Sequence, residues 1–320
     1  MNFKRRLLIL ILTFILFPIN ALALSNYLVV GGENIGINIQ SEGVLVVGFY
    51  DINKPKSDLK LGDIITSIND NKITNINDML KQMNPNQNVL KIGYKRQGNL
   101  HETILNLEKD DSGVYKTGLY VKDSITGIGT LTFIDPTTNK YGALGHSITD
   151  SKTNIKFDVL DGKIFKSEVV SIDKSRDGSP GEKNAKFYYD TIYGNIEKNL
   201  ETGIYGTYSD DYNSKLVLEV GNMSDIKLGR AYIRTTLNSN QVNEYEIEII
   251  DIDLENETKN ILFQITDKNL LDKTGGIVKG MSGSPIIQNN KIIGAVTHTV
   301  VSDNTKGYGI SIIKMLESIE

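Results

Sequence analysis

Residues 275–287 read GGIVKGMSGSPII, in which Ser282 stands between two glycines and is followed by a proline and an apolar run. This order is typical of a tight turn that leads into a buried strand. Gly280 and Gly283 permit backbone angles that a side chain forbids, so the amides around Ser282 can converge in front of its hydroxyl. The segment therefore predicts a nucleophilic serine with a backbone oxyanion site.

The hexapeptide GMSGSP at residues 280–285 resembles the Gly-Asp-Ser-Gly-Gly-Pro signature of chymotrypsin-like serine peptidases. Ser282 takes the position of the nucleophile, and Ser284 stands where the signature has glycine. The resemblance implies that the backbone amides of Gly280 and Ser282 bind the oxyanion. A surface turn that is rich in glycine and serine is the competing interpretation, and the rest of the chain has to decide between them.

Length and composition limit the possible functions. A chain of 320 residues exceeds the usual size of one domain, which favours two domains behind a targeting segment. With 29 glycines and 6 prolines the chain is expected to be a turn-rich β protein. A net charge of −4 without a long basic run argues against nucleic acid as a partner. Because there is no cysteine and only three histidines, we expect neither a metal nor a cofactor.

Residues 1–24 have the layout of a secretory signal. Three basic residues, Lys4 to Arg6, precede an apolar run at 7–17, and small residues follow at 21–23. The stretch from Leu7 to Leu24, although interrupted by Pro18 and Asn20, is also just long enough to remain in the bilayer as an uncleaved anchor. In both cases the remainder of the chain is expected to be exported.

Residues 25–108 resemble a PDZ domain, an α+β fold. The resemblance is carried by LGDIITSINDNKI at 61–73, by a helix expected over 76–83 with Asn75 as its N-cap, and by a hairpin around residues 97–99. It implies a groove between that helix and the strand at 35–40, where a peptide or the C-terminus of a protein substrate would add as a further strand.

In that groove the resemblance assigns peptide binding to Ile35, Gly36 and Ile37. The loop that would bind the carboxylate is the turn at Gly36, and it lacks an aromatic residue. The alternative is that the domain only braces its neighbour.

Residues 109–320 are expected to form a barrel or sandwich of short strands. A polar run at 108–113 marks the boundary, the charged stretch 174–185 is expected to be a solvated loop, and a short helix is expected within 310–319. The main expected strands are 119–121, 127–134, 155–160, 187–196, 203–208, 216–220, 231–236 and 244–252.

A serine needs a base before it can attack a carbonyl, and three histidines are available. His101 falls in an expected PDZ strand and is interpreted as structural. His146 follows a glycine in a turn after a strand, which favours it as the base. His298, on a strand after Ser282, is the alternative.

Taken together, the signal segment, the PDZ pattern, the turn at Gly145-His146-Ser147 and the segment at 274–287 resemble the SpoIVB family of sporulation serine peptidases. The resemblance implies a PDZ domain followed by a chymotrypsin-like double β-barrel. It also implies a peptidase exported into the space between the forespore membranes, where it cleaves membrane-associated regulatory proteins and contributes to signalling during endospore formation.

The resemblance assigns the third catalytic residue to Asp267. Chymotrypsin-like barrels normally carry this acid much farther upstream, so Asp190 and Asp272 remain alternatives. In the implied mechanism, His146 removes the proton of Ser282 during acylation and then protonates the leaving amine, and water hydrolyses the acyl-enzyme.

Two other functions compete with the peptidase. An inactive PDZ scaffold would bind peptides without cleaving them, and this leaves the pairing of His146 with the Ser282 turn unexplained. An esterase is less favoured, because the chain lacks the Gly-x-Ser-x-Gly elbow in an α/β context.

Overall fold

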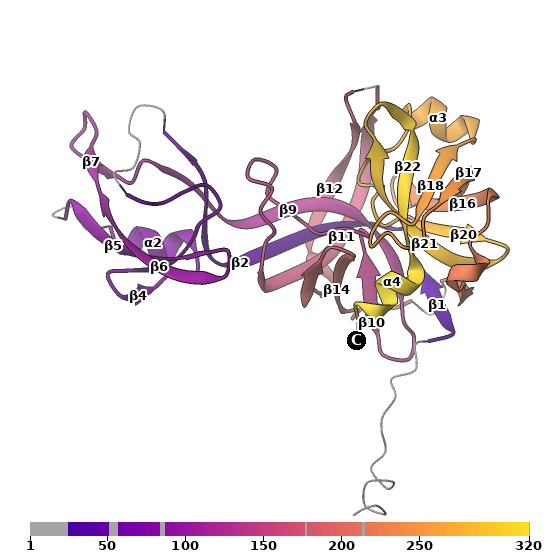
Figure 1. Ribbon diagram of the computed structural model, residues 1–320, viewed down its shortest axis with the longest axis horizontal. Coiled ribbons are helices and arrows are strands. Elements are labelled where there is room, and N and C mark those ends of the chain that lie inside the picture. Colours follow the sequence, from indigo (N-terminus) through magenta and orange to yellow (C-terminus); the bar gives the residue numbers. More distant parts are fainter. Residues whose placement is uncertain (1–24, 51–56, 84–86, 177, 213–214, 320) are drawn as a thin grey trace, which may run out of the picture.

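The computed structural model describes residues 25–50, 57–83, 87–176, 178–212 and 215–319. Two lobes of unequal size are joined by the long strands β2 (Asn34–Phe49) and β9 (Leu119–Ile134), which pair antiparallel and run from one lobe into the other (Figure 1). The predicted signal segment lies outside the described residues. Within these ranges no helix combines the length and the apolar character needed to cross a membrane.

The smaller lobe has the predicted PDZ-like order of strands and helix. Its sheet contains the second half of β2 and the first residues of β9, together with β3 (Ile64–Ile68), β4 (Asn71–Lys72), β5 (Val89–Arg96) and β6 (Asn99–Asn106). Helix α2 (Ile76–Lys81) begins as expected, because the Asn75 side chain accepts a hydrogen bond from the Asp78 amide at 2.9 Å. A two-stranded sheet of β7 (Glu108–Lys109) and β8 (Tyr115–Lys116) follows.

Asp63 of the LGDII motif connects the turn before β3 to the end of β5. Its carboxylate is buried and accepts hydrogen bonds from Arg96 Nε at 2.7 Å and from Arg96 Nη2 at 2.6 Å. The amide of Lys60 donates to the same carboxylate at 2.7 Å. The turn before β3 is therefore fastened to the end of β5 by a bidentate ion pair.

The larger lobe is built almost wholly of strands around three clusters of core residues, one of which includes Phe133, Ile292 and Met315. The first set of strands comprises β1 (Tyr27–Val30), the first half of β2, the second half of β9, β10 (Lys140–Ala143), β11 (Val159–Asp173), β12 (Gly181–Asn195), β13 (Lys198–Leu200) and β14 (Gly203–Thr207). Ile37, Leu131 and Ile164 are typical of the core they enclose.

The second set comprises β15 (Val217–Val220), β16 (Gly229–Thr236), β17 (Val242–Ile252), β18 (Ile261–Ile265), β19 (Val278–Lys279), β20 (Pro285–Gln288), β21 (Lys291–Val300) and β22 (Asp303–Ser311). Ile247, Phe263 and Ile286 are typical of its core. The short helices are η1 (Met223–Asp225), α3 (Lys268–Thr274) and α4 (Ile312–Glu317). The strands join into a closed barrel, so the predicted mainly β fold is confirmed.

The two lobes do not divide at residue 108. Strand β1 pairs with β9 and β15, and the first half of β2 pairs with β9 and β11, so both belong to the larger lobe. The chain therefore enters the smaller lobe within β2 and leaves it within β9. The two expected strands at 119–121 and 127–134 are one strand, β9.

The prediction that Ile35, Gly36 and Ile37 line a peptide groove is wrong for this structure. Ile35 pairs with Gly129 on one side and with Lys166 on the other, and the two residues after it are likewise paired on both sides. Ile35 and Ile37 are buried in the core of the larger lobe. Since the strand has no free edge, no peptide can add to it.

A second correction concerns the stretch 174–185, which was expected to be a solvated loop. Strand β12 begins at Gly181, and Lys183 within it is buried. Alternate residues of a strand face opposite sides, so a charged stretch can still contain a position that faces the interior. The charged residues around Lys183 therefore led to the wrong prediction of a loop.

Replacing Asp63 by alanine should destabilise the smaller lobe by about 2–4 kcal/mol, since the Arg96 guanidinium and the Lys60 amide both lose their acceptor. Urea denaturation of the full chain measures the change. Asp70→Ala is the matched control, because Asp70 is exposed and its ion pair with Lys91 lies on the surface. Equal effects of the two substitutions would contradict the role of Asp63.

Candidate active site

Ser282 lies in a turn between β19 and β20 whose shape depends on two glycines. Gly280 and Gly283 have φ angles of 92° and 91°. A Cβ atom at Gly283 would lie 2.1 Å from the Thr130 carbonyl oxygen and 2.5 Å from the Leu144 nitrogen. The turn therefore requires glycine at position 283 for its conformation and for the close approach of neighbouring backbone.

Residues of strand β9 form hydrogen bonds with the backbone of this turn. The Thr130 amide donates to the Ser282 carbonyl at 2.9 Å, and the Thr130 hydroxyl donates to the Gly280 carbonyl at 2.7 Å. The Thr132 hydroxyl donates to the Gly283 carbonyl at 2.8 Å. Both threonines are buried. Neither threonine was predicted as a site residue, although two threonines spaced by two in an apolar strand are a signal that buried carbonyls need donors.

The amide of Ser282 differs from those around it. Met281, Gly283 and Ser284 each donate their backbone N–H to a backbone carbonyl, at 3.1, 2.8 and 2.9 Å. The Ser282 amide has no acceptor within the part of the chain that the structure describes. A backbone donor that lacks a partner beside a serine hydroxyl is what an oxyanion site requires.

The turn that carries His146 packs against the same place. Leu144 and Gly145 both have φ angles of 70°, which turn the chain away from the end of β10. A Cβ atom at Gly145 would lie 2.9 Å from Cγ2 of Thr297, and the Ser282 hydroxyl donates to the Thr297 carbonyl at 2.9 Å. The structure thus brings the Ser282 and His146 turns together on β21, from opposite ends of the larger lobe's sequence.

The hydrogen bond of His146 defines its tautomer. Nδ1 lies 2.8 Å from the Ser147 carbonyl oxygen, which can only accept, so Nδ1 carries the proton and Nε2 is free to accept one. Burial lowers the pKa of His146 below its usual 6.5, against the opposing effects of this hydrogen bond and of Glu201. The imidazole is therefore neutral at pH 7, as a general base must be.

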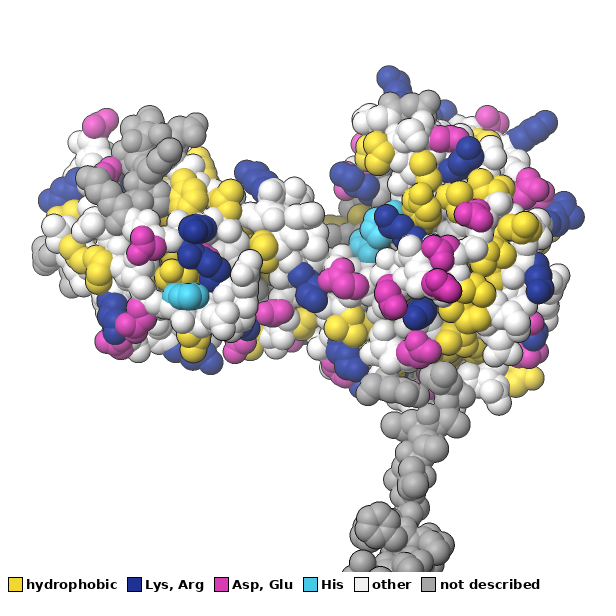
Figure 2. All heavy atoms as spheres, viewed as in Figure 1, with side chains coloured by type: hydrophobic (Ala, Val, Ile, Leu, Met, Phe, Trp, Pro, Cys, Tyr) yellow, Lys and Arg dark blue, Asp and Glu magenta, His cyan; other side chains and the backbone are white. Residues whose placement is uncertain are grey.

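His146 opens onto a pocket of about 530 Å³ that it shares with His298, Glu201 and Lys259. The two imidazole rings lie 5.1 Å apart between centroids. The pKa of His298 is lowered to about 4 by burial, by His146 and by Lys259. Figure 2 shows histidine side chains at the surface of the larger lobe, beside basic side chains and on the side that faces the smaller lobe.

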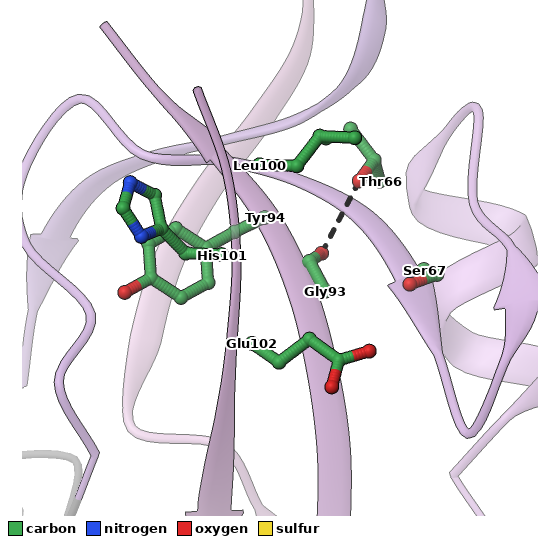
Figure 3. A pocket seen from close by; sticks show the side chains of 7 residues that line it. All are labelled: Thr66, Ser67, Gly93, Tyr94, Leu100, His101 and Glu102. Carbon is green, nitrogen blue, oxygen red and sulfur yellow. Dashed lines mark hydrogen bonds between the residues drawn. The ribbon is translucent and has the colours of Figure 1, made fainter. Parts of the chain in front are cut away.

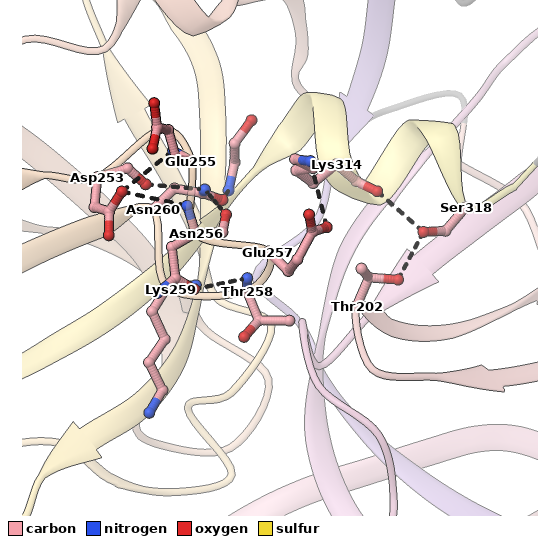
Figure 4. A network of polar contacts seen from close by, with 11 residues as sticks. Thr202, Asp253, Glu255, Asn256, Glu257, Thr258, Lys259, Asn260, Lys314 and Ser318 are labelled. Atoms are coloured by element: carbon pink, nitrogen blue, oxygen red, sulfur yellow. Dashed lines mark hydrogen bonds and ion pairs between the residues drawn. The ribbon is translucent and has the colours of Figure 1, made fainter.

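The loop at 253–260 places Lys259 at this pocket and is fixed by its own hydrogen bonds (Figure 4). The Asn256 side chain accepts from the Thr258 amide at 3.1 Å and from the Lys259 amide at 3.0 Å. The buried Asn260 side chain accepts from the Ser311 amide at 2.9 Å. The positive charge at the pocket is therefore held by an ordered loop.

The structure does not bring Asp267 to His146. Asp267 is the N-cap of α3, where its carboxylate accepts from the Leu270 amide at 2.9 Å, and it is not among the residues that line the pocket. The alternatives Asp190 and Asp272 are exposed on β12 and α3. No hydrogen bond joins any of these three carboxylates to the imidazole within the described residues.

Glu201 is the carboxylate that does line the pocket. Its charge raises the pKa of His146, and it accepts a hydrogen bond from the Ser147 hydroxyl at 3.2 Å. Glu201 was not predicted as a site residue, because only the turn between β13 and β14 brings it to the pocket. Its local sequence carries no catalytic signal.

His101 lies far from this site, in the smaller lobe. Its ring stacks on Tyr94 with 5.4 Å between the centroids, at a shallow pocket on the sheet formed by β3, β5 and β6 (Figure 3). The pocket is lined by Thr66, Ser67, Gly93, Tyr94, Leu100, His101 and Glu102. His101 is exposed there, and its structural interpretation stays a prediction.

The smaller lobe has an open strand edge at another place. Residues 119–122 of β9 pair with β2 on one side, and on the other side no strand pairs with them among the described residues. Helix α2 lies beside this part of β9, and the Ile76 amide donates to the Asp123 carboxylate at 2.8 Å. A strand edge next to a helix is the geometry that a PDZ-type groove needs.

Among solved structures, this chain is similar to the Rv3671c protease from M. tuberculosis in its active form. The identity is 12%, the match covers 61% of this chain and 74% of that chain, and the TM-score is 0.34. The inactive form of that protease gives 14% identity over 60% of this chain and 84% of that chain, with a TM-score of 0.32.

The chain is also similar to the PDZ domain of an SdrC-like protein from Listeria monocytogenes. The identity is 22%, the match covers 27% of this chain and 93% of that chain, and the TM-score is 0.24. Among curated proteins no match was found.

The sequence of residues 113–316 identifies the family of this chain. The family model described as SpoIVB peptidase S55 matches residues 113–316, which include both the His146 turn and the Ser282 turn. This range is more than half of the chain. The chain belongs to the SpoIVB peptidase S55 family and is a serine endopeptidase.

Proposed function

We propose that this peptidase cleaves membrane-associated regulatory proteins during endospore formation, with Ser282 as nucleophile and His146 as general base. The supporting observation is that the Ser282 turn and the His146 turn both lie against Thr297: the Ser282 hydroxyl donates to the Thr297 carbonyl, and the Thr297 side chain packs against Gly145. The Ser282 amide has no acceptor among the described residues, and the imidazole is neutral with Nε2 free to accept a proton. His146 takes the serine proton as the acyl bond forms and gives it to the leaving amine. A water molecule then releases the acyl group by the same route.

The Ser282 hydroxyl has to change partner before it reacts. It donates to the Thr297 carbonyl, and a rotation about its Cα–Cβ bond to another staggered position would release it toward the imidazole. Hydrogen bonds between catalytic groups often form only when substrate is bound. The oxyanion in this proposal is bound by the amides of Ser282 and Gly280.

The proposed site of action is the space between the forespore membranes. Its support is the sequence of residues 1–24, whose basic residues and apolar run are typical of an export signal or an N-terminal anchor, together with the family. Regulatory proteins anchored in those membranes would then be within reach of the exported lobes.

Recognition of a peptide or a protein C-terminus is proposed for the open edge of β9 beside α2. Backbone groups of residues 119–123 can pair with an added strand, and apolar side chains such as Met79 on α2 and Leu119 on β9 lie in the core beneath. This edge replaces the strand at Ile35–Ile37 as the proposed binding site.

Replacing Ser282 by alanine should abolish both cleavage of casein and labelling by a serine-directed phosphonate, with a loss of about 10⁴-fold or more in kcat. Ser284→Ala is the matched control in the same turn, because the Ser284 hydroxyl is buried and has no partner within the described residues. Labelling that persists in the Ser282 variant would refute the assignment. A folded wild-type protein without turnover would instead favour the inactive scaffold.

His146→Ala should cause a similar loss, since the hydroxyl then has no base. His298→Ala should retain substantial activity, because in this proposal its ring only lines the pocket. Steady-state cleavage of the same substrate measures both. The reverse result would transfer the role of base to His298.

The dependence of kcat/KM on pH should distinguish Glu201 from Asp267. Activity requires neutral His146, whose pKa is lowered by burial, so the acid limb is expected below pH 6.5. Glu201→Gln removes a charge that favours the imidazolium, so it should move the limb to still lower pH. Asp267→Asn should leave the limb in place, and a shift in that variant alone would restore Asp267 as the acid.

Peptide binding can be located by hydrogen exchange. A mixture of heptapeptides that end in a free carboxylate on Val, Leu, Ile or Phe should slow exchange at residues 119–123, because an added strand bonds to their free backbone groups. The same peptides with amidated C-termini serve as the control and should protect less. Protection at residues 35–40 instead would contradict the proposed edge.

A further inference from the structure

Lys183 is buried inside the larger lobe, although it is a lysine. It lies on β12 with only 1% of its surface exposed, and no carboxylate of the described residues forms an ion pair with it. Burial alone lowers its pKa to about 7. A buried amine without a counter-ion costs stability, so its presence needs an explanation.

The contacts of Lys183 lead to the turn that carries the nucleophile. Its Nζ lies 3.1 Å from the Thr235 hydroxyl and 3.2 Å from the Gly280 carbonyl oxygen. The side chain also passes close to the backbone of Gly280, where an added Cβ atom would lie 3.1 Å from Cδ of Lys183. The lysine and the glycine therefore fit together: a side chain at position 280 would press on the lysine stem.

The carbonyl of Gly280 and the amide of Met281 belong to one peptide plane, which is held at both ends. The carbonyl accepts from Lys183 Nζ and from the Thr130 hydroxyl, and the amide donates to the Val278 carbonyl at 3.1 Å. This plane separates the amide of Gly280 from that of Ser282, the two proposed oxyanion donors. Its orientation therefore sets the angle between them.

We infer that Lys183 is a positioning residue, which holds the Gly280 carbonyl from the interior and so keeps the oxyanion-binding turn in its active shape. The inference rests on the proposed function, because it gives Lys183 its role through the Ser282 turn. The amine does not need its charge for this: in the neutral form it still donates to the Gly280 carbonyl and can accept from the Thr235 hydroxyl.

Lys183→Met tests the inference, because methionine fills a similar volume without a donor. We expect kcat for casein cleavage to fall about 10- to 100-fold while KM stays within about twofold, since the lost interaction aligns the transition state. The melting temperature should stay equal or rise, because an apolar side chain replaces a buried amine. Lys186→Met, on the same strand but exposed, should change neither kcat nor KM.

The stability of the two proteins should also differ in its response to pH. The pKa of Lys183 is lower in the folded state than its ordinary 10.5, so the unfolded chain takes up a proton first as pH falls. Wild type should therefore lose stability between about pH 10.5 and pH 7 relative to Lys183→Met, and the difference should not grow below pH 7.

Thr130→Val provides a second measurement on the same carbonyl and remains informative if Lys183→Met does not fold. It removes the other side-chain donor to Gly280 and should likewise lower kcat more than it raises KM. Phosphonate titration gives the folded, active fraction in each case. If Lys183→Met folds and its kcat is unchanged, the inference is overturned. If Lys183→Met does not fold, an unchanged kcat in Thr130→Val overturns it. If instead wild-type turnover survives Ser282→Ala, the proposed function fails.

Discussion

Thr130 connects the two turns of the candidate site through all three of its polar groups. Its amide binds the Ser282 carbonyl, its hydroxyl binds the Gly280 carbonyl, and its own carbonyl accepts from the Leu144 amide at 3.3 Å, two residues before His146. The residue is wholly buried, so water cannot take the place of these partners. Thr130 on β9 therefore helps to set the positions of Ser282 and His146 relative to each other.

This arrangement explains why small residues are concentrated around Thr130. Gly283 approaches its carbonyl so closely that any side chain would collide, and Gly129 before it leaves room for the Leu144 side chain. The hydroxyls of Thr130 and Thr132 and the amine of Lys183 are buried donors directed at backbone carbonyls of the turn. A set of buried donors that each have an acceptor is costly to disturb, and this favours a single geometry for the turn.

The sequence predicted those features whose cause is local. The Ser282 turn follows from its glycines, α2 from its Asn75 cap, and the sheet-rich fold from short apolar runs between turn residues. Ile35, Lys183 and Glu201 were missed or misplaced because each depends on a partner far away in the chain. Ile35 lies between Gly129 and Lys166, Lys183 reaches Gly280, and Glu201 reaches the pocket only through a turn between two later strands.

The sharing of β2 and β9 by both lobes has a mechanical consequence. A PDZ-type lobe attached by a single linker could move freely. Here β2 and β9 are paired on both sides of the junction: Gln40 pairs with Ser124 on the side of the larger lobe, and Leu45 pairs with Lys122 on the side of the smaller lobe. The register shifts between these pairs, so the ribbon is irregular where it enters the smaller lobe. The open edge of β9 therefore lies on the same hydrogen-bonded strand as Thr130. The strand whose edge is proposed to bind a peptide in one lobe is the strand that supports the Ser282 turn in the other.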